Sequence, residues 1–75
     1  MPKLPVVTAR EMLQALLRGG FIVNRQTGSH IQLVKPSSPE LRVTLPFHTG
    51  DLPVSILKSV MRQAALKVEE LLELL

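Results

Sequence analysis

The Gly28-Ser29-His30 triplet is the sequence feature best suited to chemistry, and it lies where a predicted turn enters a strand. The chain has only two histidines, His30 and His48, and no cysteine. An imidazole titrates near neutral pH, so it can both accept and release a proton. His30 is therefore the best candidate for a catalytic residue if the chain performs catalysis, and a surface histidine that merely opens a strand is the alternative.

The triplet and its neighbours contain the groups that cleavage of RNA without a metal requires. That reaction needs a base for the 2′-hydroxyl, an acid for the leaving 5′-oxygen and cations beside the phosphorane. Gly28 would let the backbone approach a phosphate, and the hydroxyl and amide of Ser29 could hold an oxygen. Arg25, across the predicted hairpin, could balance charge. His48 is either a second proton carrier or a cap of the loop before the second long helix.

Two further cations, Lys58 and Arg62, lie four residues apart on one side of a predicted helix. In a module that binds double-stranded RNA, such residues contact phosphates, and a solvated helix face is the alternative. Phe21 and Phe47 are the only aromatic residues, so readers that stack single-stranded bases are disfavoured. Two histidines this far apart make a poor zinc signature, and we predict neither a metal nor another cofactor.

Length and composition favour one small domain, residues 1–75, with 45% apolar residues to fill its core. The absence of cysteine excludes disulfides and thiolate zinc sites. No apolar run approaches the roughly 20 residues that span a bilayer, and the N-terminus lacks the apolar region of a signal peptide. The expectation is a cytoplasmic protein without a membrane partner.

The net charge of +3 is unevenly distributed along the chain. Three of the six acidic residues lie in the last seven positions, so residues 1–68 carry nine basic and three acidic side chains, a net charge of +6. A basic body of this kind suggests a polyanionic partner such as RNA, with an ordinary charged surface as the alternative.

The patterns along the chain predict helix, three strands, helix and a short C-terminal helix. Thr8 and Glu11 form a capping box, and Gly19-Gly20 ends the first helix. Apolar spacing and turn residues define the remaining limits. The expected ranges are 8–18, 21–26, 30–35, 41–45, 53–64 and 68–75.

This order favours an α+β fold in which both main helices cover one face of a three-stranded antiparallel sheet, as in double-stranded-RNA-binding domains. Each face of the strand at 30–35 carries both polar and apolar side chains. We expect Ile31 and Leu33 to face the helices, which would leave His30 and Gln32 on the open face of the sheet.

Several of these segments together resemble the HicA toxin family, also called YcfA-like, over about residues 8 to 68. The matching segments are Gly19-Gly20-Phe21, Arg25-Gln26-Thr27-Gly28-Ser29-His30, Val43-Thr44-Leu45-Pro46-Phe47-His48 and Ile56-Leu57-Lys58-Ser59-Val60-Met61-Arg62-Gln63-Ala64. The resemblance implies an mRNA interferase of dsRBD-like fold that cleaves mRNA and arrests growth. It also implies a HicB-like antitoxin that covers the active surface. His30 stands where the family has its essential histidine, and His48 matches a frequent second one.

We therefore expect the toxin of a type II toxin–antitoxin pair, acting as a metal-independent endoribonuclease. Two alternatives stay open. One is an RNA-binding module that occupies its target without cutting it. The other is an interaction protein that docks a partner helix through exposed leucines near the C-terminus, which are Leu71, Leu72 and Leu75.

Overall fold

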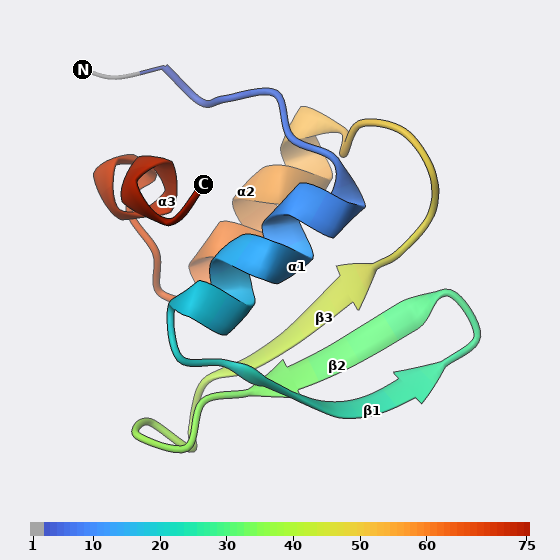
Figure 1. Cartoon of the computed structure of the whole chain (residues 1–75), viewed down its shortest axis with the longest axis vertical. Coiled ribbons are helices and arrows are strands. Elements are labelled where there is room, and N and C mark those ends of the chain that lie inside the picture. The colour runs from blue at the N-terminus through green and yellow to red at the C-terminus, as the bar shows by residue number, and fades with distance from the viewer. Residues whose placement is uncertain (1–2) are drawn as a thin grey trace.

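The computed structural model describes residues 3–75, and its elements follow the predicted order (Figure 1). They are α1 (Ala9–Arg18), β1 (Ile22–Thr27), β2 (His30–Val34), β3 (Arg42–Pro46), α2 (Val54–Gln63) and α3 (Val68–Leu74). The three strands form an antiparallel sheet in the order β1-β2-β3, and the helices lie on one side of it. The predicted α+β architecture, with an open sheet face, is confirmed.

Helix α1 begins at the predicted capping box. The Thr8 hydroxyl accepts a hydrogen bond from the Glu11 amide at 3.0 Å, and the Glu11 carboxylate accepts one from the Thr8 amide at 2.9 Å. One face of the helix is fully buried, through Ala9, Met12, Ala15 and Leu16. The chain then leaves the helix at Gly20, whose φ of 97° is one that glycine adopts without strain.

The inner face of the sheet is formed by alternate residues of β2 and β3. Ile31 pairs with Leu45 and Leu33 pairs with Val43, and all four side chains are buried. The predicted orientation of β2 is therefore confirmed. Strand β1 is different, because all six of its residues are exposed and it forms the outer edge of the sheet.

Helix α2 covers the other edge of the sheet, along β3. The Gln63 side-chain oxygen accepts a hydrogen bond from the Thr44 amide at 2.8 Å, and its nitrogen donates to the Ser59 hydroxyl at 3.1 Å. Pro46, expected to lie just beyond the strand, is its last residue. Proline is tolerated there because its missing amide hydrogen falls on the outer edge rather than in the ladder.

Helix α3 docks against the end of α1. The Arg18 guanidinium donates to the Leu74 carbonyl at 2.9 Å, and Leu71 is 0% exposed within the core. The alternative in which Leu71 is an exposed docking residue is therefore wrong, because the connection at 64–67 turns α3 back so that Leu71 lies in the core. Leu72 and Leu75 are each 42% exposed.

Candidate active site

His30 is the first residue of β2, the central strand of the sheet. Its Cα partners are Thr27 in β1 and Pro46 in β3, so backbone pairing holds it from both sides. Successive side chains of a strand point to opposite faces, and Ile31 faces the helices. The His30 side chain therefore lies on the uncovered face, where it is exposed and can meet a substrate.

The turn before His30 consists of Gly28 and Ser29, which link the paired residues Thr27 and His30. Gly28 has a φ of 57°, and Ser29 does not have a positive φ. A positive φ at the first position alone matches a type II′ hairpin turn, which requires glycine there. Within residues 3–75, no atom other than those of Gly28 and its two chain neighbours lies within 4 Å of where a Gly28 Cβ would stand, so the turn presents its backbone to solvent.

Replacing Gly28 by alanine is expected to lower the free energy of unfolding by about 1–2 kcal/mol, because an alanine is strained at this φ. Urea unfolding of the unsubstituted protein and of the variant measures this difference. Ser29→Ala, at the adjacent turn position, serves as the control and should change little. An unchanged midpoint for Gly28→Ala would show that the turn has another conformation.

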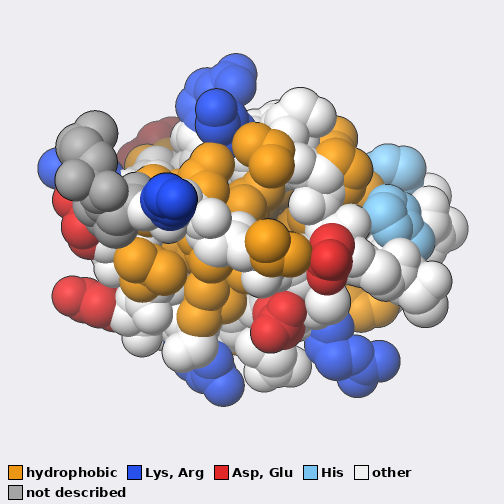
Figure 2. Space-filling view, turned by 90° about the horizontal axis from the view of Figure 1, so that it is seen from above, with side chains coloured by type: hydrophobic (Ala, Val, Ile, Leu, Met, Phe, Trp, Pro, Cys, Tyr) orange, Lys and Arg blue, Asp and Glu red, His pale blue; other side chains and the backbone are white. Residues whose placement is uncertain are grey.

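His48 lies in the loop that follows β3, at the same end of the sheet as His30. The Phe47 amide donates to the Ser29 carbonyl at 2.6 Å, which ties this loop to the hairpin turn. Figure 2 shows both imidazoles at this end of the molecule. The His48 Nδ1 lies 3.4 Å from the Thr49 carbonyl oxygen, a long contact that restrains the ring only weakly. The other ring nitrogen, Nε2, takes no part in this contact.

Arg25 lies on the same open face as His30. It pairs with Gln32 across the hairpin, just beyond an irregularity in β1, and is therefore a diagonal neighbour of His30. Its side chain and the Ser29 side chain are both exposed. The structure thus brings a cation, a hydroxyl and an imidazole to one end of one sheet face.

Lys58 and Arg62 are not part of this group. They line a separate groove of about 280 Å³ on the helical side, together with Met61 from the same helix. The rest of this groove is apolar and consists of Leu4, Leu66 and Val68. Any phosphate that these two cations contact would lie away from the histidines.

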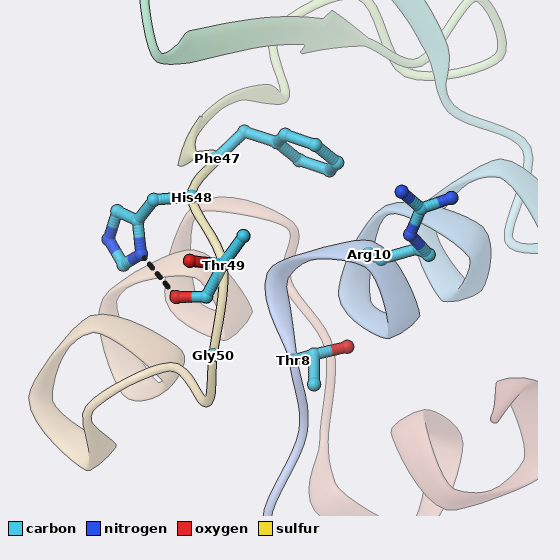
Figure 3. Close-up of a pocket in the computed structure, with 6 residues that line it drawn as sticks. All are labelled: Thr8, Arg10, Phe47, His48, Thr49 and Gly50. Carbon is cyan, nitrogen blue, oxygen red and sulfur yellow. Dashed lines mark hydrogen bonds between the residues drawn. The ribbon is translucent and has the colours of Figure 1, made fainter.

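A pocket of about 470 Å³ adjoins His48 between the start of α1 and the loop after β3 (Figure 3). Its lining residues come from both segments and are Thr8, Arg10, Phe47, His48, Thr49 and Gly50. A bridge between Thr8 and Asp51 holds the two segments together. Arg10 and Thr49 were not among the predicted site residues. No sequence motif connects Arg10 with Thr49, because their segments are joined by a backbone bridge, which does not depend on particular side chains.

Two further properties concern metal binding and membrane insertion. Among residues 3–75, no group of three or more His, Cys, Asp or Glu side chains gathers as metal ligands would. None of the helices in this part of the chain has the length and apolar character to cross a membrane.

Comparison with known protein families bears directly on this arrangement. The profile of the family described as the HicA toxin of bacterial toxin–antitoxin systems matches residues 9–66. The chain belongs to the HicA toxin family. The match runs from the start of α1 past the end of α2 and includes both histidines, whereas α3 lies outside it. No curated protein matches the sequence significantly. Membership makes the chain a toxin and implies an antitoxin partner.

Proposed function

We propose that this toxin is a metal-independent endoribonuclease that cleaves mRNA by histidine acid–base catalysis. The observation that carries the proposal is the position of His30 on the open sheet face, with His48 brought to the same end by the Phe47–Ser29 hydrogen bond. Two imidazoles at one site can take and give a proton within a single reaction.

In the proposed reaction, one histidine accepts the proton of the 2′-hydroxyl while the 2′-oxygen forms a bond to phosphorus. The bond from phosphorus to the 5′-oxygen breaks, and the other histidine gives its proton to that oxygen. The products are a 2′,3′-cyclic phosphate and a free 5′-hydroxyl. The Gly28-Ser29 turn would hold a non-bridging phosphate oxygen, and Arg25 would offset the charge of the phosphorane.

The remaining predicted contacts extend this site along the substrate. Lys58 and Arg62 would bind phosphates at a distance from the cut, because their groove lies on the helical side. A HicB-like antitoxin would inhibit by covering the open face around His30. The proposed place of action is the cytoplasm, where mRNA is translated.

Incubation of the purified toxin with labelled RNA in EDTA tests the proposal. Strand scission in the presence of the chelator is expected. A shifted but intact RNA band would instead favour a module that binds without cutting. Salt dependence separates both from an interaction protein, since each phosphate contact to a single strand contributes about −0.7 to the slope of log affinity against log salt.

Replacing His48 by alanine is expected to lower the cleavage rate by about 10²-fold, the lower end of the usual range for a proton-transfer group. The effect should be smaller than that of removing His30, because the His48 ring is restrained only by a 3.4 Å contact in a loop, whereas His30 is held in a strand that is paired on both sides. The variant should also lose one limb of the bell-shaped dependence of rate on pH. The limb at low pH disappears if His48 is the base, and the limb at high pH disappears if it is the acid. If the pH dependence of the rate keeps both limbs in the variant, His48 does not transfer a proton in the reaction.

A further inference from the structure

The pocket beside His48 has the size and composition of a site for one planar aromatic ligand. Its volume of about 470 Å³ lies within the range of small-molecule sites. It is also held open by the backbone, because the Leu52 amide donates to the Val7 carbonyl at 2.8 Å and the Thr8–Asp51 bridge lies next to this bond. The start of α1 and the loop are thus fixed relative to one another before any ligand arrives.

Phe47 gives the pocket an aromatic wall. Its side chain is half-buried and packs against the core, which restrains the ring without covering it. In Figure 3 the ring extends from the loop toward the Arg10 side of the pocket, whereas the His48 imidazole points to the other side of the loop. A phenyl ring held in this way can stack against a base, and such stacking tolerates any of the four bases.

The opposite wall is polar and cationic. Arg10 is exposed on the first turn of α1, and its guanidinium can pair with a phosphate or stack on a planar ring. The Thr8 hydroxyl already accepts from the Glu11 amide, so its own hydrogen remains available to an acceptor. Together with Thr49, these groups line the same pocket as Phe47 and offer polar partners to a ligand there.

From these contacts we infer that the pocket is a nucleobase subsite, which binds the base of the nucleotide next to the scissile phosphate. The inference rests on the proposed RNA substrate and deepens it. His48 lines the pocket and belongs to the loop tied to the hairpin turn of His30, so a base on Phe47 would lie across this loop from the two imidazoles, and the RNA backbone would pass around the loop to place the adjoining phosphate beside them. Arg10 binds that nucleotide from the helix side.

Titration of the full-length, isotope-labelled toxin with nucleoside monophosphates tests the subsite by NMR without requiring cleavage. Nucleotides should shift the amide signals of Thr8, Arg10 and Thr49. Ribose 5-phosphate, which lacks the base, should bind about tenfold more weakly, as expected for the loss of one stacked base. Phe47→Leu keeps an apolar side chain against the core but removes the aromatic face. In this variant the difference between the two ligands should disappear.

Arg42→Gln is the matched control, because Arg42 is exposed at the end of β3 away from the histidines. It should change the binding of both ligands little and preserve the tenfold difference, whereas Arg10→Gln should weaken the binding of nucleotides, because Arg10 lines the pocket. Urea unfolding confirms that each variant is folded at the assay temperature.

The outcomes separate this inference from the proposed enzyme. Base-dependent binding through Phe47 in a toxin that cuts no RNA would support the subsite and overturn only the ribonuclease. Cleavage of RNA combined with equal binding of nucleotide and ribose 5-phosphate would overturn the subsite alone. If Phe47→Leu weakens the antitoxin complex and leaves nucleotide binding unchanged, the pocket belongs to the protein partner and the inference is wrong.

Discussion

Replacing His30 by alanine is expected to lower the rate of RNA cleavage by about 10³-fold or more, within the range typical of a general acid or base. The substituted side chain is exposed and makes no contribution to the core, so the thermal unfolding curve should stay nearly unchanged. Expression of the variant should no longer arrest growth. Single-turnover cleavage and a growth assay measure the two effects.

Gln32→Ala provides the matched control for His30→Ala. Gln32 lies two residues further along β2, on the same open face and also exposed, but its amide side chain does not titrate. Its loss should reduce cleavage by much less than the loss of His30. If the His30→Ala variant still arrests growth, as the Gln32→Ala variant does, His30 does not take part in the reaction.

The largest expected effect on stability belongs to Leu71. Its side chain is 0% exposed and fixes α3 to the rest of the core, so Leu71→Ala should lower the free energy of unfolding by about 2–5 kcal/mol. That is a large part of the roughly 5–15 kcal/mol that stabilises a domain. Urea or thermal unfolding of the two proteins measures the difference directly.

Leu72 is the control for Leu71, since it is the next residue of the same helix and is 42% exposed. Leu72→Ala should change stability by no more than about 0.5 kcal/mol, as surface substitutions do. Equal effects of the two substitutions would show that α3 is not docked as the structure has it. They would also revive the interpretation of the C-terminal leucines as a docking surface.

The elements that can be predicted from the sequence are those that a pattern of neighbouring residues determines. The capping box at Thr8, the glycines after α1 and the alternation of Val43 and Leu45 each determine an element from a few neighbouring residues. The orientation of β2 followed from two apolar side chains, Ile31 and Leu33. Because burial decides which face of a strand turns inward, that orientation also placed His30 on the open face.

The features that the sequence leaves undecided depend on contacts between distant segments. The burial of Leu71 follows from the turn that folds α3 back onto α1, and the leucine pattern alone does not distinguish Leu71 from Leu72. The separation of Lys58 and Arg62 from the histidines follows from how α2 packs against the β3 edge. Arg10 lies beside the loop after β3 because the Thr8–Asp51 bridge joins that loop to the start of α1.

The most direct measurement of the central claim is the chemistry of the cut. An RNA oligonucleotide cleaved by the toxin in EDTA should yield a 2′,3′-cyclic phosphate and a 5′-hydroxyl. A single 2′-deoxy substitution at the cleavage position should abolish that cut, because it removes the nucleophile. Cleavage that persists at the 2′-deoxy position, or products that carry a 5′-phosphate, would contradict attack by the 2′-oxygen assisted by His30.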